Sequence, residues 1–136
     1  MLRELEIEAK DDNLDTVIGL VTEEMEKMDC PPKIVIKMSV AVEEIFVNIA
    51  HYAYGDKTGS AKIQVEGCED PRGISITFID SGMPYDPLEK EDPDINLSAE
   101  ERQIGGLGIF MVKKTVDDID YKYEDGKNIL HIFKSF

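Results

Sequence analysis

Three short motifs carry the side chains of this sequence that could do chemistry. They are Glu44-x-x-x-Asn48, then Asp80-Ser81-Gly82-Met83-Pro84, and then Gly105-Gly106-Leu107-Gly108. The first motif offers a carboxylate that can accept a proton and an amide oxygen that can ligate a divalent cation. The second offers a carboxylate acceptor, and the third offers unobstructed backbone N–H groups that suit a phosphate. Each motif alone is a weak signal, but together and in this order they predict a site for Mg²⁺ and ATP.

The first motif lies on a segment, residues 33–54, whose apolar side chains predict a long and largely buried helix. Lys37, Glu44, Asn48 and His51 fall within a sector of roughly 60° on that helix. A solvated stripe is the alternative, but asparagine suits an exposed helix interior poorly. We therefore expect Glu44 to act as a general base and Asn48 to ligate Mg²⁺ and contact the nucleotide. His51 is kept as a candidate nucleotide contact, although a histidine here is more typical of a core or rim position.

The second motif follows a segment, residues 74–79, whose composition is typical of a strand. Asp80 at its end could accept a hydrogen bond from the exocyclic amine of adenine. Gly82 would let the backbone approach the base, and Pro84 is a further candidate nucleotide contact. The alternative is that Asp-Ser-Gly is only a turn, for which these residue types are common.

The third motif begins an apolar segment with the residues Gly105, Gly106, Leu107 and Gly108. A glycine-rich entry into a helix forms an anion site from free N–H groups and the helix dipole. The glycines could also serve as a hinge for the charged stretch before them. Arg102 in that stretch is the cation that could reach a γ-phosphate, and an ion pair with a neighbouring acid is an equally good interpretation.

The remaining pattern predicts one α/β domain over residues 1–136, a sheet with helices on one face. The expected strands are residues 2–9, 61–66, 74–79, 119–124 and 128–133, and the expected helices are 14–28, 33–54 and 107–116. Asn13 is the expected cap of the first helix, Gly55 ends the second, and a turn containing Pro71 and Gly73 joins the second and third strands. Asp125-Gly126 is typical of a hairpin turn between the last two strands. Residues 81–105 are too long for an ordinary connection and are interpreted as a lid.

Composition narrows the classes of partner. The net charge of −14 argues against binding to a nucleic-acid backbone or an anionic membrane. It favours solubility, a basic protein partner, or both. No apolar run reaches the ~18 residues that a membrane span needs, and the first residues do not resemble a signal peptide, so we expect a cytoplasmic protein. Cys30 and Cys68 fit no metal-ligand spacing and are expected to be free thiols.

Taken jointly, the motifs resemble those of the anti-sigma factor serine/threonine kinases, within the superfamily that includes gyrase and the histidine kinases. The matching residues are Glu44, Asn48 and His51, the run Asp80-x-Gly82-x-Pro84-Tyr85-Asp86-Pro87, and Gly105-Gly106-Leu107-Gly108-Ile109. The resemblance covers essentially the whole chain. It implies a two-layer sandwich of the Bergerat ATP-binding type, with a mixed, mostly antiparallel sheet, helices on one face and an ATP lid at residues 81–105.

The same resemblance implies roles for individual residues and for partners. Glu44 would be the base, Asn48 the Mg²⁺ ligand, Asp80 the adenine contact, and Asn128 would lie near the adenine on the late strand. The phosphate would pass to a small antagonist protein, and a homodimer would also bind a sigma factor or another regulator. Two alternatives stay open: a non-catalytic switch that ATP closes, and a detached histidine-kinase-like domain that needs a phosphoacceptor histidine on another chain.

Overall fold

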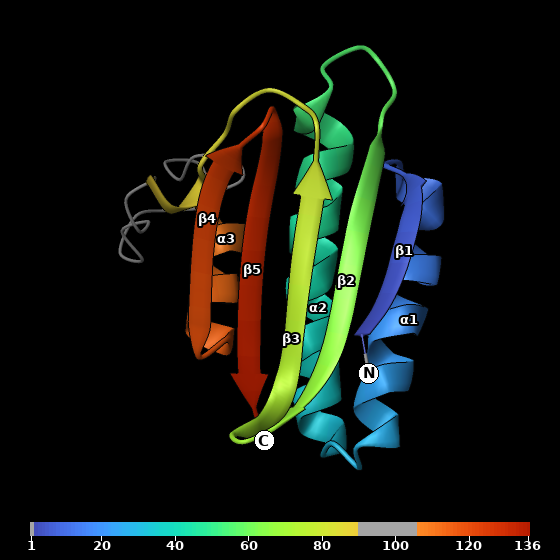
Figure 1. The fold of residues 1–136 in the computed structure, drawn as a ribbon, viewed down its shortest axis with the longest axis vertical. Coiled ribbons are helices and arrows are strands. Elements are labelled where there is room, and N and C mark those ends of the chain that lie inside the picture. The colour runs from blue at the N-terminus through green and yellow to red at the C-terminus, as the bar shows by residue number, and fades with distance from the viewer. Residues whose placement is uncertain (1, 90–105) are drawn as a thin grey trace.

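A five-stranded sheet covered on one face by helices is the architecture of the computed structural model, which describes residues 2–89 and 106–136 (Figure 1). Helices α1, α2 and α3 lie side by side behind the sheet, and the other face of the sheet is open. The elements are β1 (Leu2–Glu8), the 3₁₀ turn η1 (Asp11–Asn13), α1 (Leu14–Lys27), α2 (Pro32–Asn48), the π-helix η2 (Ile49–Ala53), β2 (Ser60–Glu69), β3 (Arg72–Asp80), the 3₁₀ turn η3 (Pro87–Glu89), α3 (Gly106–Thr115), β4 (Asp118–Glu124) and β5 (Lys127–Ser135).

The sheet has the strand order β1-β2-β3-β5-β4, and all four pairings are antiparallel. The predicted two-layer α/β class is therefore confirmed; the expected sheet was mixed and mostly antiparallel, and the described strands are all antiparallel. Two of the four pairings are hairpins, because β2 turns directly into β3 and β4 turns directly into β5. At the second hairpin Asp125 and Gly126 have φ angles of 54° and 77°, as a two-residue hairpin turn requires.

Alternation along the strands places the core between the sheet and the helices. Buried side chains recur at every second position of β2 and β3 and face the buried stripe of α2. The fully buried large residues include Phe46, Ile63, Ile76 and Phe78. Burial of several such side chains, at about 1.5–3 kcal/mol each, is the main favourable contribution to this fold.

Two local details differ from the sequence-based expectation. Asn13 precedes α1 as expected, but its side chain donates to the carbonyl oxygen of Glu8 at 2.8 Å and makes no cap hydrogen bond. The 3₁₀ turn η1 leads directly into α1, and the side-chain amide of Asn13 instead binds the end of β1. Gly73 belongs to β3 and pairs with Ser135, because β2 and β3 extend further than predicted and leave a narrower turn.

The predicted long helix forms as α2, whose last turn widens into the π-helix η2. Single π turns are rare and often occur where a helix contributes to a functional site. Gly55, at a φ angle of 60°, follows this turn as the sequence predicted.

Both cysteines are free, Cys30 buried and Cys68 half-buried, as the sequence predicted. In the described part of the chain, no helix is both long enough and apolar enough to cross a bilayer.

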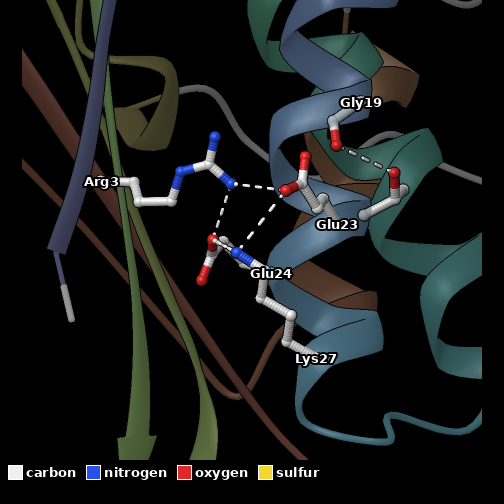
Figure 2. A network of polar contacts seen from close by, with 6 residues as sticks. Arg3, Gly19, Glu23, Glu24 and Lys27 are labelled. Carbon is white, nitrogen blue, oxygen red and sulfur yellow. Dashed lines mark hydrogen bonds and ion pairs between the residues drawn. The ribbon is translucent and has the colours of Figure 1, made fainter.

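A charged network fastens the edge strand β1 to α1. Figure 2 shows Arg3 reaching from β1 to two glutamates of α1, Glu23 at 3.2 Å and Glu24 at 2.8 Å. Lys27 contacts the same two carboxylates at 3.5 and 3.2 Å. The side chain of Glu24 is only 11% exposed, whereas that of Glu23 is 57% exposed. The hydrogen bond from Arg3 lowers the pKa of Glu24, and burial opposes this effect only in part.

We expect Glu24→Gln to lower the free energy of unfolding by about 1 kcal/mol at pH 7, because it removes the charge from a hydrogen-bonded, largely buried group. A carboxyl whose pKa is lowered by folding stabilises the protein above its unfolded pKa, and this stabilisation is lost as the pH falls through the folded pKa. The difference between variant and wild type should therefore shrink below about pH 4. Urea unfolding of both proteins at pH 7 and at lower pH measures this difference in the free energy of unfolding. Glu23→Gln is the matched control, with a smaller expected effect since that carboxylate is exposed; equal losses for the two variants would contradict the assignment.

Candidate functional site

A cavity of about 570 Å³ opens between the end of α2, the end of β3 and the start of α3. Its volume falls within the range of small-molecule binding sites. Most of its wall is apolar or aromatic, and three polar side chains, Asn48, Asp80 and Asn128, enter it. The lining residues are Ile45, Asn48, Ile49, Tyr52, Ala53, Phe78, Asp80, Met83, Pro84, Tyr85, Pro87, Ile109, Tyr121, Asn128 and Leu130. A flat, mostly apolar ligand with a few polar edges would suit such a cavity.

Asp80 and Asn128 form the polar floor of the cavity. They are directly opposite each other on β3 and β5, and both are buried. Asp80 Oδ1 accepts hydrogen bonds from Asn128 Nδ2 and from the backbone N–H of Gly82, each at 2.9 Å. Both of these contacts use the same oxygen. Among the described residues no donor contacts Asp80 Oδ2, so this oxygen could accept a hydrogen bond from a ligand.

The amide of Asn128 also holds the loop that follows β3. Its Nδ2 donates to the carbonyl oxygen of Met83 at 2.9 Å, and its Oδ1 accepts from the backbone N–H of Tyr85 at 3.1 Å. The hydroxyl of Tyr121 donates to the same Oδ1. Burial raises the pKa of Tyr121, which keeps this hydroxyl protonated. The resemblance implied that Asn128 lies near the adenine, and this stays a prediction; in the structure Asn128 positions both Asp80 and the loop.

A second set of contacts fastens this loop to the end of η2. The backbone N–H of Met83 donates to the carbonyl oxygen of Ala53 at 2.8 Å. A Cβ atom on Gly82 would lie 2.2 Å from that same oxygen, so only glycine fits this close approach. The Tyr54 hydroxyl accepts from Ser81 N at 2.9 Å and donates to Ser60 O at 2.6 Å. Sequence reasoning did not identify Tyr54 in this role, since its partners are defined only once the chain has folded.

Glu44 lies beside the cavity, at the start of α3. A Cβ atom on Gly108 would be 2.2 Å from Glu44 Oε2 and 3.0 Å from its carboxyl carbon. The carboxylate therefore occupies the space that a side chain at position 108 would need. Asn48, one turn further along α2, lines the cavity itself. The carboxylate and the amide of the first motif thus both face the region where α3 begins.

The other predicted site residues are placed as follows. Pro84 lines the cavity, and Gly106 and Leu107 form the first turn of α3. His51 Nε2 contacts the carboxylate of Asp11 at 2.8 Å and is absent from the cavity wall. His51 lies at the exposed rim because the π turn η2 redirects the end of the helix and because Asp11, 40 residues away in sequence, binds the imidazole. Arg102 and Gly105, and the predicted lid beyond residue 89, lie outside the described residues.

We expect Gly108→Ala to displace the carboxylate of Glu44 while leaving the fold intact, because the colliding atoms are the far end of a flexible side chain. Any activity that uses this carboxylate should fall at least about tenfold, a lower bound for a mispositioned general base. Gly19→Ala is the matched control on α1, where the new Cβ would meet nothing within 4 Å. It should raise the free energy of unfolding by about 0.5–1 kcal/mol and leave the activity unchanged. Full activity of Gly108→Ala would show that this contact is dispensable.

Comparison with known proteins agrees with this geometry. Residues 7–134 match the family described as the histidine kinase-like ATPase domain, and this chain belongs to that family. It is similar to the serine-protein kinase RsbW of Bacillus cereus strain ATCC 10987, with 31% identity over 97 residues, 68% of this chain and 59% of that protein. RsbW of Listeria monocytogenes is 26% identical over 98 residues, 68% of this chain and 61% of that protein. The matches therefore span about 60% of the length of these relatives.

Two solved structures share the fold. The RsbU and RsbW domains of Rv1364c from Mycobacterium tuberculosis align with a TM-score of 0.67 at 14% identity, over 98% of this chain and 32% of that one. A histidine kinase domain from Erythrobacter litoralis aligns with a TM-score of 0.59 at 16% identity, over 90% of this chain and 60% of that one. The resemblance seen in the three motifs is thus confirmed at the level of family and fold.

Proposed function

We propose that this chain is an ATP-dependent protein serine/threonine kinase of the anti-sigma type, acting as a single domain in the cytoplasm. The observation that carries the proposal is the position of the Glu44 carboxylate against Gly108, one turn from Asn48 in the cavity wall. The similarity to serine-protein kinases named RsbW supports it.

The cavity fits an adenine base. Asp80 Oδ2 would accept from the exocyclic amine, and the apolar walls would contact the ring faces. Asn128 would hold Asp80 in place rather than contact the base itself. The triphosphate would then extend toward the first turn of α3, where Gly106 and Gly108 have no side chains that would cover the backbone N–H groups.

Asn48 fits the role of a Mg²⁺ ligand. No group of three or more histidine, cysteine, aspartate or glutamate side chains converges on a common point in the described part of the chain. A single amide oxygen is nevertheless a sufficient protein contribution where phosphates and water supply the other oxygen ligands. The bound ion would neutralise charge on the phosphates.

Glu44 would accept the proton of the attacking hydroxyl. The bond that forms joins the serine or threonine oxygen to the γ-phosphorus, the bond that breaks joins that phosphorus to the β–γ bridging oxygen, and ADP leaves. Such a transfer requires mainly positioning and charge stabilisation. Arg102 is the candidate for a further contact to the transferred group.

The expected partners are a small antagonist protein as the phosphoacceptor, and a sigma factor or similar regulator bound by a homodimer. The test is to incubate the purified protein with Mg²⁺ and γ-labelled ATP, together with each candidate antagonist from its own genome, and to map the labelled residue. We expect label on one serine or threonine. Nucleotide binding without labelling of any hydroxyl would favour the non-catalytic switch, and failure to bind adenine nucleotides would contradict both.

A further inference from the structure

The outer surface of α2 and α3 exposes large apolar side chains. Ile36 is 66% exposed, Val40 38% and Met111 47%. Isolated apolar side chains on a surface are ordinary, but a group of them next to a candidate catalytic residue suggests an interaction surface. We call this surface the α2–α3 patch, and it consists of Lys33, Ile36, Lys37, Val40, Met111 and Lys114.

The contact between Glu44 and Gly108 fixes how the two helices align. They run in opposite directions behind the sheet (Figure 1). Val40 is one turn before Glu44 on α2, and Met111 is about one turn after Gly108 on α3, so the two exposed residues lie at the same level of the helical layer. The patch is therefore continuous with the position of the candidate base.

The charge of the patch is opposite to that of the protein as a whole. The sequence has 29 acidic residues against 15 basic ones. At the β1–α1 edge of the molecule, Arg3 and Lys27 are paired with glutamates. By contrast, Lys33 and Lys37 make no ion pair with any described residue, and Lys114 lies over the ring of Phe110 at 5.3 Å. Glu43 is also exposed and follows Val40 by three residues, so one carboxylate borders the three lysines of the patch.

We propose that the α2–α3 patch docks the protein substrate through an acidic segment with apolar residues that flanks the phosphoacceptor serine; this rests on the proposed kinase function. Lysines and apolar side chains together complement such a segment. Lys37 is seven residues before Glu44, roughly 10 Å along the helix. In an extended chain that distance corresponds to about three residues, so the recognised acid lies about three positions from the serine.

The test uses two fluorescein-labelled peptides with one central serine, one carrying glutamate and leucine around it and the other carrying lysine in place of each glutamate. Fluorescence anisotropy measures binding to the full chain, and a fluorescent ATP analogue measures nucleotide affinity separately. The docking variant is Lys33→Glu with Lys37→Glu. The control is Lys62→Glu with Lys122→Glu, which makes the same change in net charge on the open face of the sheet.

We expect the wild type to prefer the acidic peptide, and the docking variant to bind it ~10-fold more weakly while the control changes less than about twofold. Nucleotide affinity should be unchanged in both variants. Equal losses in the two variants, no preference between the peptides, or no binding of the acidic peptide to the wild type would overturn the proposal. If the wild type transferred no phosphate or bound no nucleotide, that result would instead contradict the proposed function.

Discussion

Replacing Glu44 by glutamine is expected to reduce phosphoryl transfer by about 10²–10⁴-fold, the usual contribution of a general base. Glutamine has nearly the same shape and cannot accept the proton of the attacking hydroxyl. The side chain lies against the start of α3 and outside the cavity wall, so the affinity for ATP should change little. Single-turnover transfer from labelled Mg-ATP to the antagonist measures the first quantity, and titration with a fluorescent nucleotide measures the second.

Glu43→Gln is the matched control for this variant. It removes the same charge from the adjacent residue, whose side chain is exposed. It should transfer phosphate at the wild-type rate. If Glu44→Gln also transferred at that rate, Glu44 would not be the base. If wild type and variant both failed to transfer but controlled a partner equally well, the non-catalytic switch would be the better description.

The second large effect is expected for Asp80→Asn, which should weaken ATP binding by about 100-fold. Asn128 and the N–H of Gly82 both donate to Oδ1 of Asp80, so the new amide must turn its oxygen toward them. Its NH₂ group would then face the cavity, where the adenine amine is also a donor. Two donors would be opposed without an acceptor between them, in a buried site where this is costly.

Isothermal titration with ATP and with ADP measures this loss, which should be similar for the two ligands because they share the base. Asp120→Asn is the control, since that carboxylate lies on the open face of the sheet and its side chain is 73% exposed. Wild-type affinity in Asp80→Asn would exclude Asp80 from the recognition of the base.

Local periodicity was sufficient to predict the parts of the site that lie on one element. Glu44 and Asn48 are one turn apart on α2, so their common orientation follows from helix geometry alone. Asp80 ends a strand whose alternation is clear in the sequence, and that alternation determines which way the residue points. For the same reason the strand and helix assignments were right over most of their length.

Contacts between distant segments could not be predicted in this way. Asn128 reaches Asp80 across 48 positions and Met83 across 45, and this requires the pairing of β3 with β5, which periodicity does not specify. The contact of His51 with Asp11 depends in addition on the π turn at the end of α2. The missed roles of Asn128 and Tyr54 are therefore tertiary, and they concern how the site is held rather than which groups act in it.

The bifurcated amide of Asn128 has a thermodynamic consequence. The Asn128 side chain contacts both Asp80, the acid proposed to bind the base, and the backbone at Met83 and Tyr85. The free energy of nucleotide binding therefore depends on the conformation of the segment that contains Met83 and Tyr85. Linkage is reciprocal: if ATP changes the affinity for a protein that binds this segment, that protein must change the affinity for ATP by the same factor. A regulator bound to this segment would then change the dissociation constant of the nucleotide without entering the cavity.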